Sequence, residues 1–130
     1  PHCITVSGVN IQDSIKEFRF SSSNGNKKIG KPDIAANCVD LCSLNTDTEY
    51  ISERNGKKLY PKTLDIPYTS YTGTSCAVAY VSGVCALLFE NNPALTFKDL
   101  LSLIKVSSEL APISKSSQGN GIININKLLP

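Results

Sequence analysis

The segment Gly73-Thr74-Ser75 leads directly into an apolar stretch that ends near Phe89. Glycine adopts backbone angles that other residues avoid, and Thr and Ser are good helix caps, so we predict a helix capped here by Thr74 or Ser75. A helix N-terminus carries unpaired N–H groups and a partial positive charge, which stabilise developing negative charge. The sequence therefore predicts that Ser75 is placed for chemistry that passes through an oxyanion.

The tripeptide alone also fits a turn and helix cap without any chemistry, because Gly, Thr and Ser are favoured at both. The wider pattern is more informative than the tripeptide. Gly-Thr-Ser-x-Ala-x-x-x-Val-x-Gly extends from Gly73 to Gly83. A single helix then has to hold the serine at its first turn and bury much of its length.

The composition is that of one globular domain, with 130 residues, 41% hydrophobic and 18% charged. A net charge of +2 is too small to predict nucleic acid as a partner. No apolar run reaches the ~18 residues of a membrane span, so we expect none. Five cysteines leave at least one unpaired within the chain. Because neither the cysteines nor the acidic residues show metal-ligand spacing, we expect no metal site.

The remaining sequence predicts strands and helices that position this segment. Expected strands are Cys3–Val9 and Phe18–Ser22, and Asn55-Gly56 predicts a hairpin turn within Tyr50–Tyr60. Asn91-Asn92-Pro93 should end the first helix, and a second should cover Phe97–Ile104 after a capping box at Thr96 and Asp99. Ser114–Gly119 is expected to be a polar loop.

Several segments resemble, in order, motifs of the subtilases, the subtilisin-like serine proteases. They are the strand Cys3–Val9, the segment after Phe18, Lys31–Leu41, Gly73–Gly83 and Gly119–Asn126. Because they cover nearly the whole chain, residues 1–130 are identified as the C-terminal portion of a subtilase catalytic domain. The resemblance implies a three-layer α/β fold, incomplete here, with a mainly parallel sheet and flanking helices.

The resemblance also implies roles for single residues. Ser75 is the expected catalytic nucleophile of peptide-bond hydrolysis through an acyl-enzyme, and its N–H is an oxyanion donor. Gly73, Thr74 and Tyr71 are expected at the oxyanion and substrate-binding site, although Tyr71 fits packing at the rim equally well. The resemblance makes Asp33 a structural residue.

The chain departs from the family pattern at three places. Asn37-Cys38 stands where the family usually has Pro-Gly, and we expect Asn37 to supply the unusual backbone angles of that turn. Ala79-Tyr80 stands where Pro-His is most frequent, and Cys76 stands where the family usually has Met or another small residue. None of these departures removes the Gly-Thr-Ser.

Subtilases supply their triad in the order Asp, His, Ser, so the Asp, the His and the oxyanion Asn are expected upstream of this chain. Alone, it is expected to be inactive. Its partners would be a peptide or protein substrate and the missing N-terminal half, in the same polypeptide or a separate chain. The resemblance favours a secreted or cell-surface location; no cofactor is evident, and structural calcium would belong to the parent protein.

Two other functions remain open. The chain could belong to a pseudoprotease, with the fold kept as a binding or regulatory module. It could also be a small hydrolase using Ser75 with Asp33 and His2, the only histidine. That arrangement requires residues of unrelated segments to converge, and His2 is expected to be a surface residue.

Overall fold

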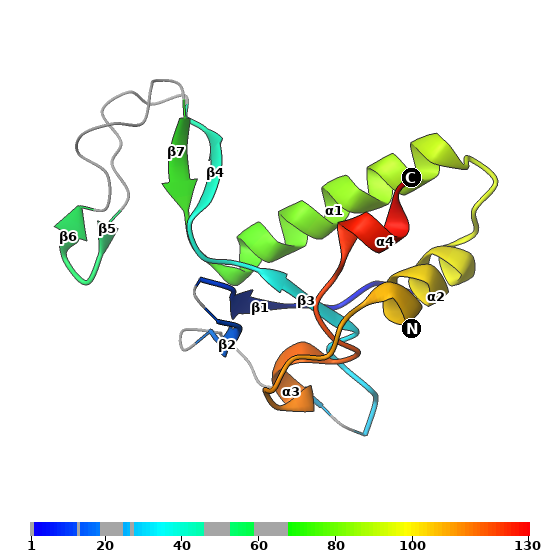
Figure 1. Cartoon of the computed structure of the whole chain (residues 1–130), viewed down its shortest axis with the longest axis horizontal. Coiled ribbons are helices and arrows are strands. Elements are labelled where there is room, and N and C mark those ends of the chain that lie inside the picture. The colour runs from blue at the N-terminus through cyan, green and yellow to red at the C-terminus, as the bar shows by residue number, and fades with distance from the viewer. Residues whose placement is uncertain (1, 13, 19–24, 27, 46–52, 59–67) are drawn as a thin grey trace.

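The structure, a computed structural model of the chain, describes every residue except 1, 13, 19–24, 27, 46–52 and 59–67 (Figure 1). The strands are β1 Val6–Asn10, β2 Lys16–Glu17, β3 Ile34–Asn37, β4 Leu41–Leu44, β5 Glu53–Arg54, β6 Lys57–Lys58 and β7 Tyr68–Tyr71. The helices are α1 Thr74–Asn91, α2 Phe97–Ser107, α3 Lys115–Gln118 and α4 Ile125–Leu128.

The central sheet has the order β2-β1-β3. β1 and β3 run parallel, with Val6 opposite Ile34 and Val9 opposite Asn37. The C-terminal segment extends this sheet, because Ala35 donates its amide to the Gly121 carbonyl and accepts from the Ile123 amide, both at 2.9 Å. The sheet is small in the described part of the chain, as expected for an incomplete domain.

Helix α1 packs on β1 and β3 (Figure 1). Its buried residues are Ala77, Val81, Val84 and Leu88, at the spacing that brings side chains to one face of a helix. Leu100 and Ile104 of α2 join them in the same core. Burial of these apolar side chains fixes the helix on the strand pair.

The second helix forms as the sequence predicts. The Thr96 hydroxyl accepts from the Asp99 amide at 3.2 Å, and the Asp99 carboxylate accepts from the Thr96 amide at 3.0 Å. This reciprocal pair satisfies two N–H groups that a helix start would otherwise leave free. Helix α1 ends at Asn91 with Asn92 as its C-cap, within the Asn91-Asn92-Pro93 segment that was expected to end it.

The hairpin is also present, with β5 and β6 joined through Asn55 and Gly56 at φ 54° and 75°. These left-handed angles suit the two central residues of a tight hairpin turn. The outer arms, 50–52 and 59–60, lie outside the described residues, as does most of the expected Phe18–Ser22 strand. The strand β2, Lys16–Glu17, ends directly before it.

Two local expectations were wrong. Asn37 is the last residue of β3, and the left-handed residue is Asp40, at φ 54°. The Asn37 side chain instead bonds the turn, accepting from the Val39 amide and donating to the Val39 carbonyl. The expected polar loop at 114–119 contains α3, which has only four residues.

The expectation about apolar length needs correction too. Helix α1 has 18 residues with a mean hydropathy of 1.2, so by length and composition alone it could cross a membrane. Core helices of water-soluble proteins meet the same criterion. Here the stripe Ala77, Val81, Val84 and Leu88 packs on the sheet, but only 22% of the helix is buried, so the expectation that α1 buries much of its length was wrong.

Removing a core side chain from α2 should destabilise the fold strongly. Ile104 is fully buried, whereas its neighbour Leu103 is 44% exposed. We expect Ile104→Ala to lower the free energy of unfolding by about 2–5 kcal/mol, because it leaves a cavity in the core. Urea denaturation measures the change, with Leu103→Ala as the matched control. Equal losses in the two variants would contradict the observed packing.

Candidate active-site cleft around Ser75

Ser75 is the second residue of α1, so the predicted position at a helix N-terminus is confirmed. The predicted cap is wrong, because Gly73 is the N-cap residue and no side chain caps the helix. Gly73 has φ 153° and ψ 156°, a conformation that a residue with a Cβ rarely adopts. Its carbonyl accepts from the Cys76 amide at 2.9 Å. The Ser75 hydroxyl is therefore not used as a cap.

The loop ahead of the helix is tied to the turn that follows β3. The Gly73 amide donates to the Cys38 carbonyl at 2.8 Å. One residue earlier, the Thr72 hydroxyl accepts from the Asp40 amide at 2.9 Å and lies 3.3 Å from the Asp40 carboxylate. Gln12 donates to the same carboxylate at 2.7 Å. These bonds set the angle at which the chain enters α1.

Asp40 and Thr72 were not identified as positioning residues from the sequence. Their roles depend on hydrogen bonds between residues 32 positions apart, which no local pattern reveals. The one available signal was the residue type. Aspartate tolerates the left-handed conformation and bonds nearby backbone groups, so Asp40 was a reasonable turn candidate.

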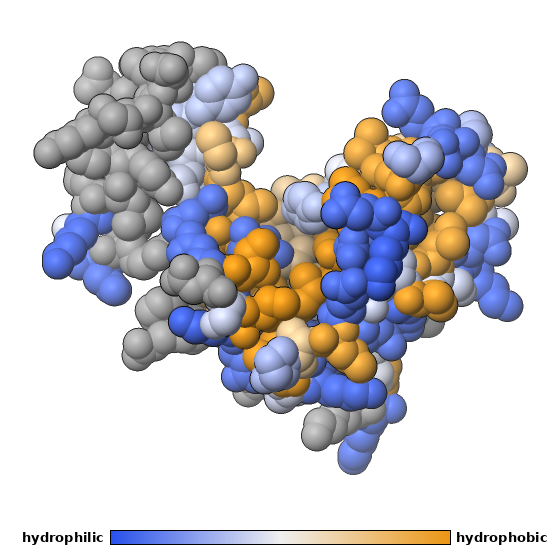
Figure 2. All heavy atoms as spheres, viewed as in Figure 1, coloured by the Kyte–Doolittle hydropathy of each residue, from blue (hydrophilic) through white to orange (hydrophobic). Residues whose placement is uncertain are grey.

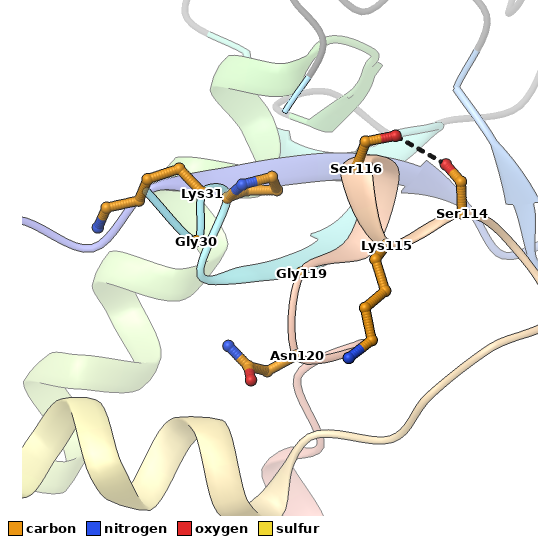
Figure 3. A pocket seen from close by; sticks show the side chains of 8 residues that line it. Gly30, Lys31, Ser114, Lys115, Ser116, Gly119 and Asn120 are labelled. Carbon is orange, nitrogen blue, oxygen red and sulfur yellow. Dashed lines mark hydrogen bonds between the residues drawn. The ribbon is translucent and has the colours of Figure 1, made fainter. Parts of the chain in front are cut away.

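A pocket of about 540 Å³ lies away from this serine, around Lys115 and Asn120. Figure 3 shows the Lys31 side chain directed away from both. The Lys31 ammonium is instead paired with the Asp33 carboxylate. No site residue expected from the sequence lines this pocket.

Ser75 opens onto a separate pocket of about 420 Å³ between β4, β7 and the start of α1. Its lining residues are Leu41, Cys42, Ser43, Tyr71, Ser75, Cys76, Ala79 and Tyr80. Figure 2 shows the surface hollowed between the β4–β7 ribbon and α1. The structure thus brings two of the expected site residues, Ser75 and Tyr71, to one cleft, whereas Gly73 and Thr74 do not line it.

Within this cleft the two hydroxyls differ. The Tyr71 hydroxyl donates to the Leu44 carbonyl at 2.9 Å, which fixes the ring across the β4–β7 ribbon. Ser75 is exposed, and its hydroxyl has no hydrogen-bond partner among the described residues. A serine held at a helix start with its hydroxyl free is available to a base and to a substrate.

Asp33 lies elsewhere, in a structural network. Its carboxylate accepts from the Thr5 amide at 2.8 Å and pairs with the ammonium groups of Lys31 and Lys105. Burial raises the pKa of Asp33, but these hydrogen bonds and charges outweigh it, so the pKa lies below the usual value.

This placement bears on the standalone hydrolase. Neither Asp33 nor His2 lines the Ser75 pocket, and His2 is exposed at the start of the chain. The standalone hydrolase therefore has no geometric support.

In the described part of the chain, no three His, Cys, Asp or Glu side chains lie close enough together to hold a metal ion.

The conformation of Gly73 can be tested by adding a methyl group. A Cβ at either Gly73 or Gly83 would meet no atom within 4 Å, but only Gly73 has the unusual φ. We expect Gly73→Ala to cost about 1–3 kcal/mol through backbone strain. Gly83→Ala should be neutral or stabilising by up to about 1 kcal/mol, because alanine favours the helix interior.

Chemical denaturation of both variants measures this contrast. Comparison of the two variants separates the effect of the backbone angle from that of steric crowding, because neither added methyl group meets another atom. An unchanged stability of Gly73→Ala would mean that the helix start does not require glycine.

The Asp33 network predicts a pH dependence. A carboxylate whose folded-state pKa is lowered stabilises the fold fully above its unfolded pKa of about 3.9, and this stabilisation is lost as pH falls through the folded value. We expect the stability advantage over Asp33→Asn to be constant from pH 7 to about 5 and to shrink below about 4. Urea titrations at several pH values measure it, and an advantage that grows in acid would contradict the network.

Comparison with known proteins shows which family this chain is similar to. The chain matches the model of the subtilase family, Peptidase_S8, over residues 1–121. It is 33% identical over 88 residues to Furin-like protease 2 of Drosophila melanogaster, which covers 61% of this chain and 5% of that protein. It is 29% identical over 121 residues to the serine protease AprX of Bacillus subtilis (strain 168), which covers 91% and 26% respectively.

Solved structures show the same fold. Fervidolysin from Fervidobacterium pennivorans aligns with a TM-score of 0.69 and 19% identity, over 98% of this chain and 19% of that one. MycP1 from Mycobacterium smegmatis aligns with a TM-score of 0.60 and 20% identity, over 98% and 29%. The chain spans at most about a quarter of the length of these two curated relatives. This chain belongs to the subtilase family, and its α/β structure is that of an incomplete subtilisin-like domain.

Proposed function

We propose that this chain carries the nucleophile, Ser75, of a subtilisin-like serine endopeptidase that hydrolyses peptide bonds through an acyl-enzyme. One observation carries the proposal: the Ser75 hydroxyl is free and exposed at the start of α1, on the wall of a 420 Å³ cleft. Family membership supports the assignment of this serine rather than another.

The geometry suits attack on a carbonyl carbon. As the Ser75 oxygen bonds to that carbon, the carbonyl oxygen gains negative charge. The N–H groups of the first turn of α1, that of Ser75 included, and the positive end of the helix dipole stabilise such a charge. Gly73 and Thr74 hold the turn that presents these groups, and Tyr71 lines the opposite wall.

The base that takes the serine proton would come from outside residues 1–130. A serine protease of this kind uses a histidine oriented by a carboxylate. In this chain the only histidine is His2, which is exposed and does not line the cleft. We therefore propose that the missing His, Asp and oxyanion Asn belong to a preceding part of the domain, and that this chain alone is inactive.

An exposed apolar surface supports such a partner. Ile4 and Val6 form a groove of about 460 Å³ with Val78, Phe89 and their neighbours on α1 and α2. β1 is paired to β3 along Val6–Val9, but to β2 only at Val9 and Asn10. Figure 2 shows other apolar side chains gathered on the exposed surface. An additional strand and an apolar face would complete this side of the sheet.

The expected location follows from the same proposal. A secreted or cell-surface enzyme is proposed for the parent polypeptide. The structural relative MycP1 is described as an essential component of a type VII secretion system, which is a statement about that protein.

Covalent labelling tests the nucleophile directly. In the full polypeptide that contains this chain, we expect a fluorophosphonate probe to label one residue, Ser75, and Ser75→Ala to abolish labelling. Ser82→Ala is the matched control, since Ser82 is exposed on the same helix and its hydroxyl donates to the Val78 carbonyl at 2.9 Å. In-gel fluorescence and peptide mapping give the readout.

Two outcomes would oppose the proposal. Labelling that survives Ser75→Ala would place the reactive serine elsewhere. If a folded full-length protein does not label, the pseudoprotease function takes precedence, and a binding partner should be sought.

A further inference from the structure

Two of the five cysteines lie in the same cleft as Ser75. Cys76 follows the serine in α1, and Cys42 is on β4 across the pocket. Cys42 is exposed and Cys76 is half-buried, and neither is in a disulfide. Two free thiols therefore share a cleft with the proposed nucleophile.

The other cysteines lie in different surroundings. Cys3 is exposed near the start of the chain, and Cys85 lines the separate groove that faces Ile4 and Phe97. Cys38 is completely buried, and burial, with a smaller effect from Cys76, raises its pKa to about 12. A thiol reacts as the thiolate and needs access, so Cys38 should be inert. The chain thus contains its own controls for the two thiols of the cleft.

We propose that Cys42 and Cys76 make the Ser75 cleft a thiol-modification site, at which capture of a small disulfide-type electrophile blocks the serine. The inference rests on the proposed function of Ser75. Its physical basis is space, because the cleft of about 420 Å³ is in the range of sites that hold one small molecule. A group attached to either sulfur occupies the volume that a substrate beside Ser75 requires.

A thiosulfonate reagent can carry out the proposed modification of the cleft thiols. The cysteine thiolate attacks the methylthio sulfur of methyl methanethiosulfonate, having released its proton to solvent. A protein S–SCH3 bond forms, the S–S bond of the reagent breaks, and methanesulfinate leaves with the electron pair. A thiol such as dithiothreitol reverses the modification. A biological low-molecular-weight disulfide would react in the same way, with a thiolate as leaving group.

The test uses the full polypeptide and two readouts. The protein is treated with methyl methanethiosulfonate; the modified cysteines are mapped by mass spectrometry, and remaining reactive serine is measured with the fluorophosphonate probe. Each variant is compared with its own untreated sample. We expect treatment to reduce labelling at least tenfold, to modify Cys42 or Cys76, and to be reversed by dithiothreitol.

Variants separate the cleft from the rest of the chain. The double variant Cys42→Ala/Cys76→Ala should keep its labelling after treatment, and the single variants show which thiol dominates. Cys3→Ala and Cys85→Ala should lose labelling as the unsubstituted protein does. Loss of labelling in the double variant equal to that in the unsubstituted protein would overturn the proposal, as would modification of both cleft thiols without loss of labelling.

The two readouts also distinguish failure of the thiol-modification site from failure of the function proposed for Ser75. If untreated protein never labels, the function proposed for Ser75 fails, and blockade of the serine fails with it. Mapped modification still decides whether the cleft captures thiol reagents. Labelling before treatment combined with unmodified Cys42 and Cys76 would overturn only the thiol site.

Discussion

The structure depends on a close contact between three segments that meet under the start of α1. A Cβ on Gly8 of β1 would lie 2.6 Å from the Cys38 sulfur and 3.1 Å from the Thr74 Cγ2, so only glycine fits there. The Cys38 carbonyl, in the turn after β3, also accepts from the Gly73 amide. The parallel pair β1–β3 therefore sets the position of the first turn of α1, and with it that of Ser75.

Apolar packing and polar bonds have separate tasks around this junction. The stripe of α1 from Ala77 to Leu88 fixes the helix on the sheet, whereas the bonds of Asp40 to Thr72 fix the direction in which the chain enters it. The serine itself contributes nothing to either task in the described part of the chain. This is what a functional site requires, because a hydroxyl engaged in structure is less available for chemistry.

Much of this arrangement was predictable from local patterns. The start of α1 at the Gly-Thr-Ser, the capping box of α2 and the Asn55-Gly56 turn all depend on neighbours within a few residues, and each formed as expected. The cap of α1 and the turn after β3 were predicted wrongly. In both cases residue preference named Thr74, Ser75 or Asn37, but contacts with distant segments decided the conformation. The hydrogen bonds of Asp40 with Gln12 and Thr72 join residues about 30 positions apart, so no local sequence pattern predicts them.

The central claim is that Ser75 is a nucleophile held beside oxyanion donors. The most direct measurement is a crystal structure of the full polypeptide after reaction with a fluorophosphonate. We expect a covalent bond from phosphorus to the Ser75 Oγ, with the phosphoryl oxygen within about 3 Å of the Ser75 amide. An unmodified Ser75, with the phosphonyl group bonded to another side chain, would contradict it.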